Sequence, residues 1–149
     1  MKMFRFSSFI FLFSLLSWFF VVSVWASDQW PKKRGELCWD NNIGSGGTRT
    51  LQITNTGNGH YSLHGRYTPK EGQVRPVVGS AEIVDDSIFM ILTSAGKNNA
   101  GLLVTSTLYV VLDKSTLNGT SEIINHGYTG SEISQTYATG TETLVSCKK

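Results

Sequence analysis

Apolar and polar residues alternate with a period of two in most segments after residue 34, which is typical of half-buried β-strands. The segment 60–67 is the clearest example: Tyr61, Leu63 and Tyr67 fall on one face, and His64 and Arg66 on the other. No segment of this region shows the 3.6-residue period of an amphipathic helix. We therefore predict eight strands and no helix. The predicted strands are residues 35–41, 48–55, 60–67, 75–84, 87–94, 101–112, 117–124 and 132–147.

Short, turn-forming segments join these strands, so the chain is predicted to form an antiparallel meander. Asn58-Gly59 is a strong hairpin signal, because both residues tolerate a positive φ angle. Asp85-Asp86 marks the turn between the fourth and fifth strands, and a glycine-bearing loop, 125–130, is expected between the last two. A meander of this length either packs as a sandwich or closes into a barrel.

Two cysteines favour one of these architectures over the other. Cys38 lies in the first predicted strand and Cys147 ends the last one. A disulfide requires the two Cα atoms to lie within about 7 Å. The first and last strands of an eight-stranded up-and-down barrel are neighbours, whereas a sandwich allows such a bridge without requiring it. We therefore predict an all-β, eight-stranded antiparallel barrel that is closed by one disulfide.

The first 26 residues have the pattern of a secretory signal peptide. Lys2 and Arg5 precede an apolar run, and Val24-Trp25-Ala26 offers a cleavage site with small residues. The alternative is an uncleaved anchor, but the run is shorter than the ~20 residues of a bilayer span. We expect residues 1–26 to be removed, 27–34 to form a tail and 35–149 to form one domain, in a secreted or periplasmic protein.

Removal of the signal peptide also changes the charge. The chain has 13 Lys and Arg residues and 11 Asp and Glu residues, and Lys2 and Arg5 leave with the signal. The mature chain is therefore formally neutral, which argues against nucleic acid or an anionic membrane as a partner. The short basic run Lys32-Lys33-Arg34 is interpreted as a solvated tail.

The fifth and sixth predicted strands are apolar on both faces. Phe89 and Ile91 alternate with inward residues of the fifth strand, and Tyr109 and Val111 do so in the sixth. A lone barrel would leave one of these faces in water, and a contiguous apolar patch usually marks a contact surface. We expect a homo-oligomer that forms through this wall.

Catalytic and metal-binding patterns are absent from the sequence. His60 and His64 are four residues apart on a strand, so about 13 Å separates them and they do not chelate one ion. No glycine-rich phosphate loop, nucleophile elbow or paired carboxylates are found. We expect no enzyme activity, no metal and no cofactor. Asn118-Gly119-Thr120 matches the glycosylation sequon, which matters only in a eukaryotic source.

The first strand and the loop after it carry a resemblance to a known family. Trp39-x-Asn41-x-Ile43-Gly44-Ser45 and the later Gly65-x-Tyr67-Thr68 resemble the start of the avidin and streptavidin family, and Pro76-x-x-Gly79-Ser80 is compatible with its fourth strand. The resemblance implies an eight-stranded barrel, a tetramer and a ligand in the open end. It assigns Asn41, Ser45 and Tyr67 to hydrogen bonds with the ureido oxygen of biotin, with Trp39 beside them.

The family also lines its cavity with tryptophans from later strands, and this chain has none after Trp39. The resemblance therefore supports a small-molecule-binding barrel better than it supports biotin as the ligand. A second interpretation gives Trp39 the floor of the barrel and makes Asn41 and Gly44 a turn. A cavity of ~300 Å³ or more lined by Trp39, Asn41 and Tyr67 would favour ligand binding. A filled interior would favour a protein-binding or inhibitor module.

Overall fold

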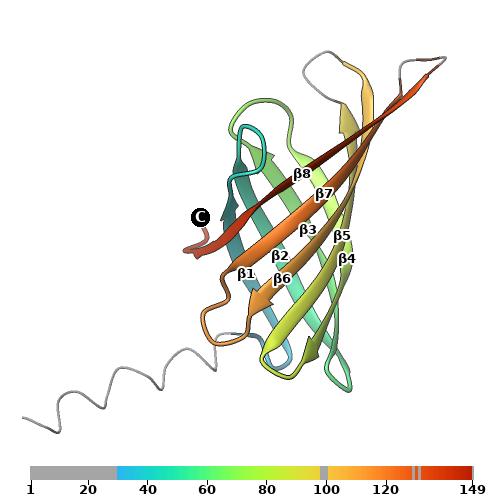
Figure 1. Ribbon diagram of the computed structural model, residues 1–149. Helices are drawn as coiled ribbons and strands as arrows, with labels where there is room; N and C mark the ends of the chain where they lie inside the picture. Colours follow the sequence, from blue (N-terminus) through green and yellow to red (C-terminus); the bar gives the residue numbers. More distant parts are fainter. Residues whose placement is uncertain (1–29, 98–100, 129, 131, 149) are drawn as a thin grey trace, which may run out of the picture.

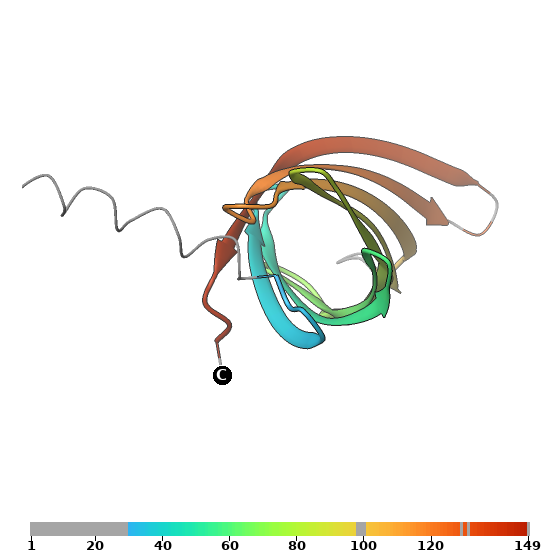
Figure 2. The same cartoon turned by 90° about the horizontal axis from the view of Figure 1, so that it is seen from below.

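The protein forms one closed barrel of eight antiparallel strands in the computed structural model, which describes residues 30–97, 101–128, 130 and 132–148. Each strand pairs with the next along the chain, and β1 pairs with β8 (Figures 1 and 2). The strands are β1 (Arg34–Asn41), β2 (Gly47–Gly57), β3 (His60–Pro69), β4 (Arg75–Val84), β5 (Ser87–Lys97), β6 (Leu103–Asp113), β7 (Gly119–Tyr128) and β8 (Ile133–Val145). The predicted fold class is confirmed. The predicted signal peptide lies outside the described residues.

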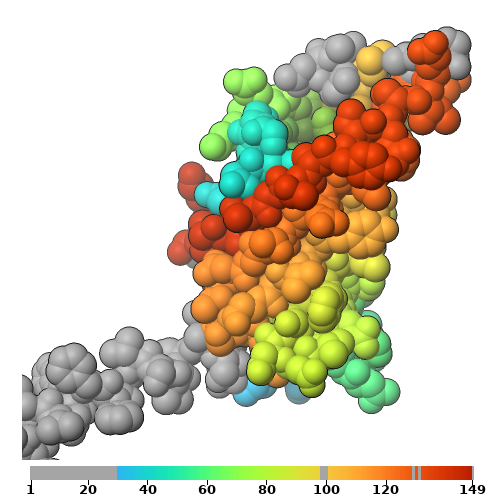
Figure 3. All heavy atoms as spheres, viewed as in Figure 1, coloured from blue at the N-terminus to red at the C-terminus, as the bar shows by residue number. Residues whose placement is uncertain are grey.

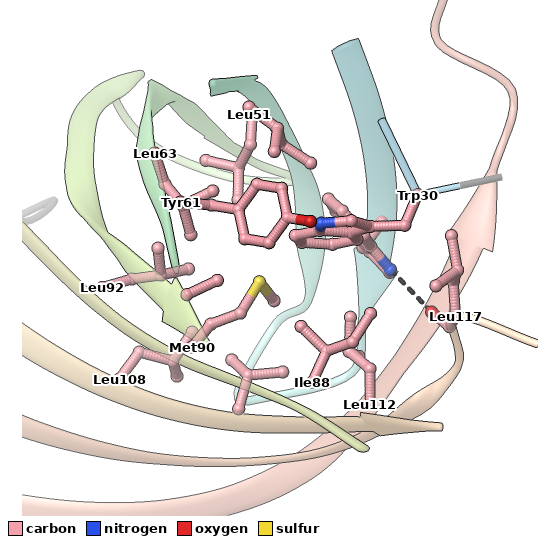
Figure 4. Packing of buried hydrophobic residues seen from close by; sticks show 14 of the residues in the cluster. Trp30, Leu51, Tyr61, Leu63, Ile88, Met90, Leu92, Leu108, Leu112 and Leu117 are labelled. Atoms are coloured by element: carbon pink, nitrogen blue, oxygen red, sulfur yellow. Dashed lines mark hydrogen bonds between the residues drawn. The ribbon is translucent and has the colours of Figure 1, made fainter. Parts of the chain in front are cut away.

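The alternation in the sequence defines the two faces of the barrel wall. The apolar residues predicted on one face of β2, β3, β5 and β6 are buried in a single core, and their neighbours face outward. The members of this core drawn in Figure 4 include Leu51, Leu63, Ile88, Leu92, Leu108 and Leu112.

The barrel closes through a short seam between β1 and β8. Only Cys38–Asn41 of β1 pairs with β8, opposite Val145 to Glu142, whereas β7 pairs with β8 over ten residues. The predicted disulfide between Cys38 and Cys147 crosses this seam, with its Cα atoms 5.2 Å apart. Such a bond indicates an oxidising, non-cytosolic environment. In Figure 3, β7 and β8 run as adjacent bands across one face of the molecule.

Two predicted boundaries around β7 are wrong. Leu117 has a φ angle of 56° and lies in the β6–β7 turn, where its N–H donates to the carbonyl of Asp113, so the strand begins at Gly119 instead. The Asp113 carboxylate accepts hydrogen bonds from Ser115 and Thr116, and these bonds lower the pKa of Asp113. At its other end, β7 continues through the predicted loop to Tyr128, because residues 125–128 pair with residues 133–136.

Two tryptophans fill the end of the barrel that holds this turn. Trp39 is fully buried, and its Nε1 donates to the carbonyl of Leu117 over 2.8 Å (Figure 4). Trp30 precedes β1, in the segment predicted as a tail, yet it is buried and packs against Trp39 and, edge to face, against Tyr61. This end is therefore a solid floor, and any opening into the barrel interior lies at the other end. Within the described residues, no helical segment has the length and hydropathy of a membrane span.

Candidate functional site

The half of the barrel interior that lies farther from the tryptophan floor contains a hollow, and this hollow opens to solvent at the end opposite the floor. It has about 430 Å³ of empty space, including its opening to solvent, and about 50 Å³ of this can hold the centre of a water molecule. One water needs about 10–15 Å³ of such volume, so the hollow admits roughly three to five water-sized groups. The expected cavity of ~300 Å³ or more lined by Trp39, Asn41 and Tyr67 is therefore not found, because the hollow is much smaller and Trp39 does not line it. Its lining consists of Asn41, Ile43, Arg49, Tyr67, Arg75, Val77, Leu92, Thr93, Ser94, Ser106, Leu108 and Ile123.

Three polar residues form a row across the inner wall of this hollow. Arg49 of β2 lies directly opposite Tyr67 of β3, and Tyr67 lies directly opposite Arg75 of β4. Residues at opposed positions of neighbouring strands point to the same face, so all three belong to the inner face. The Arg49 guanidinium carbon lies 5.5 Å from the centre of the Tyr67 ring, within the range of a cation–π contact.

The floor of the hollow is apolar. Ser94 and Ser106 face each other across β5 and β6, and Leu92 and Leu108 form the next opposed pair towards the barrel floor. Leu108 in turn lies opposite Ile123 of β7. A molecule in the hollow would therefore meet hydroxyls and arginines near the opening and hydrocarbon below them.

Arg49 is neutralised by a buried carboxylate. It forms an ion pair with Glu142 of β8, and the two side chains are only 7% and 1% exposed. The Ser121 hydroxyl donates to Glu142 Oε1 over 2.6 Å, which satisfies a second lone pair of the carboxylate. The pair joins β2 to β8 across β1, so it also supports the short seam of the barrel.

Arg75, by contrast, has no carboxylate partner within the described part of the chain. Its Nη2 lies 3.5 Å from the carbonyl oxygen of Lys97, and its Nε is shut off from solvent without a hydrogen-bond acceptor among the described residues. A Cβ at Gly96 would lie 3.0 Å from Arg75 Cγ, so the missing side chain of Gly96 gives the arginine stem its path across β5. The lining therefore carries two guanidiniums and no acidic residue.

The four residues predicted to bind a ligand separate into two groups. Asn41 and Tyr67 line the hollow, whereas Trp39 lies in the floor and Ser45 lies exposed in the β1–β2 loop. Asn41 Nδ2 donates to the carbonyl of Gly47 over 2.9 Å, and Asn41 Oδ1 accepts from the N–H of Ile43 over 3.3 Å. These are the bonds of a turn, as the second interpretation of this stretch expected.

Tyr67 also holds the β1–β2 loop. Its hydroxyl donates to the carbonyl of Gly46 over 3.1 Å. A Cβ at Gly47, the first residue of β2, would lie 2.7 Å from the Tyr67 ring, so only glycine lets the ring lie against the end of this loop. The position of the loop and the position of the Tyr67 ring beside Arg49 are therefore coupled.

Sequence reasoning missed Arg49, Arg75 and Glu142. A signal was present for the first two: Arg49 alternates with Leu51, and Arg75 alternates with Val77, so both share the inward face of their strands. In the described residues, no three His, Cys, Asp or Glu side chains come together as metal ligands.

The fold and the hollow define the class of this protein as an up-and-down β-barrel with one closed and one open end. No protein-family model matches the chain, and no curated protein matches its sequence.

Proposed function

We propose that this chain is an exported, non-catalytic protein that binds a small ligand in the open end of its barrel. The disulfide supports export, because such bonds persist in oxidising compartments. The carrying observation is the row Arg49–Tyr67–Arg75 around an open hollow. Placing charged side chains inside a barrel costs free energy. Apolar side chains would fill the interior without this cost, as they do at the floor of this barrel.

The avidin resemblance points to the same end of the barrel as the site, but two features of this chain argue against biotin as the ligand. In this chain no tryptophan follows Trp39, and the free space is too small to enclose a molecule of the size of biotin. We propose a ligand that inserts a small group into the hollow and leaves its remainder in the opening.

Filling the hollow tests the proposal. Ser94 lines the hollow, and Ala95 is the next residue of β5, on the exposed outer face. We expect native mass spectrometry of protein purified from its own host to show a co-purified small molecule on the wild type and on Ala95→Phe. Ser94→Phe should lose the molecule, because its ring occupies the space.

Comparison of Ser94→Phe with Ala95→Phe separates the filling of the hollow from any general effect of an added aromatic ring on β5. A wild-type spectrum with no added mass, or an added mass that survives Ser94→Phe, would argue against a site in the barrel. Circular dichroism of both variants confirms that each retains the sheet.

A second candidate function, protein binding, is favoured by the outer wall of β5 and β6. Phe89 lies opposite Val111, and Ile91 lies opposite Tyr109, and all four side chains are 41–49% exposed. They form an apolar square on the outer face. Exposed patches of this kind mark contact surfaces, and a second copy of the chain is the proposed occupant.

Self-association through the square predicts a mass in solution above that of one chain. Size-exclusion chromatography with light scattering at micromolar concentration should give at least a dimer, and Phe89→Ser/Val111→Ser should return the monomer. Val78→Ser is the control, because Val78 is exposed on β4 outside the square. A monomeric wild type would refute the proposed interface.

A further inference from the structure

We infer that the ligand is a monoanion with a short apolar stem, bound through a carboxylate at Arg75. This inference rests on the proposed function and specifies the ligand of the same site. It depends on the positive charge of Arg75, a residue to which the avidin resemblance assigns no role.

The sign of the ligand charge follows from the charges around the hollow. The lining holds Arg49 and Arg75, and the only carboxylate in contact with either among the described residues is Glu142, which pairs with Arg49. One positive charge is left over, on Arg75. A single negative charge on the ligand would balance it, whereas a cation would be repelled and a dianion would leave a surplus in a partly closed site.

The hydrogen-bonding capacity of Arg75 points to a planar acceptor. A guanidinium binds a carboxylate through two parallel N–H donors, and these charge-assisted bonds are among the strongest available in proteins. Arg75 Nε is shut off from solvent, so a ligand reaches only the Nη edge of the guanidinium, where the bond from Nη2 to Lys97 is long, at 3.5 Å. A carboxylate at this Nη edge would supply a strong acceptor that the protein does not.

The shape of the hollow sets the rest of the ligand. Below Arg75 the inner wall passes through Val77 and Ser94, which are directly opposed, to Leu92 and Leu108. These surfaces favour hydrocarbon, and the free space admits a stem of roughly three or four carbon atoms. Butanoate has this size and charge.

The test titrates the intact, disulfide-bonded protein with three four-carbon compounds that differ in charge, namely butanoate, butanamide and butylammonium. Chemical shifts of the backbone amides of Val77, Ser94 and Ser106 report binding in the hollow. We expect butanoate to bind at least tenfold more tightly than butanamide, because a charge-assisted hydrogen bond is lost in the amide. Butylammonium should not bind. Acetate, which lacks the stem, should bind more weakly than butanoate.

Arg75→Gln should remove the preference for butanoate over butanamide, and Arg75→Lys should retain part of it. Arg66→Gln is the matched control: Arg66 is exposed on the outer face of β3, so this change removes the same charge outside the hollow. The spectrum of each variant shows whether it is folded.

Three results would overturn the inference: equal affinity for butanoate and butanamide, equal affinity for butanoate and acetate, or no shift with any compound. An unchanged preference in Arg75→Gln would also overturn it. None of these results bears on whether a co-purified molecule is displaced by Ser94→Phe, so the inference can fail while the proposed function stands.

Discussion

Replacing Glu142 with leucine is expected to lower the free energy of unfolding by about 3–5 kcal/mol, which is the usual cost of leaving one partner of a buried ion pair unpaired. Arg49 would keep its charge in a place where only 7% of the side chain reaches solvent, and Ser121 would lose its acceptor. Urea unfolding followed by circular dichroism measures the change. Glu122→Leu is the matched control, because Glu122 lies on the exposed outer face of β7, and it should change stability by less than about 1 kcal/mol.

The double variant Arg49→Met/Glu142→Leu distinguishes an unpaired charge from lost packing. Removing both charges together is often neutral or stabilising, so the double variant should recover most of the loss. If it is no more stable than Glu142→Leu alone, the cost does not come from the stranded arginine. A loss of less than about 1 kcal/mol in Glu142→Leu would show that the pair contributes little to the seam.

Removing the disulfide is expected to have an effect of similar size. The bond between Cys38 and Cys147 closes a loop with a sequence separation of 109 residues. The chain-entropy model assigns such a loop about 4–5 kcal/mol. The β1–β8 seam that the bond crosses has only four residue pairs, so few other contacts hold the first strand to the last. Urea unfolding of Cys38→Ser/Cys147→Ser should show this loss.

The control for this prediction is chemical. A thiol reductant should bring the wild type to the stability of the double serine variant and should leave that variant unchanged. A wild type that loses less than about 1 kcal/mol on reduction would show that the β1–β8 pairing and the Arg49–Glu142 ion pair close the barrel without help.

The barrel could be predicted because the patterns that specify it can be recognised in the sequence alone. A period of two assigns each strand residue to a face, and a pair of cysteines at the two ends brings the first strand to the last. The prediction failed where a local rule was overridden. Leu117 continues an apolar pattern but adopts a positive φ angle in a turn held by Asp113, and residues 125–128 pair with β8 despite their polar, glycine-bearing composition.

The site was predictable only in part, because it depends on contacts between distant strands. Asn41 and Tyr67, two of the four residues predicted to bind a ligand, line the hollow. Nothing local indicates that Glu142, some ninety residues after Arg49, would be its buried partner, because that contact depends on how the barrel closes. Trp30 shows the same limit: it precedes β1 and was predicted to lie in a tail, yet its ring is buried against Trp39 and Tyr61 in the floor of the barrel.

We propose above all that the open end of the barrel holds a ligand. The most direct measurement is a crystal structure of the protein purified from its own host, without added small acids. We expect electron density in the hollow for a molecule other than water, with its acidic group against Arg75 and its stem towards Leu92 and Leu108. A hollow that contains only ordered water would contradict the proposal.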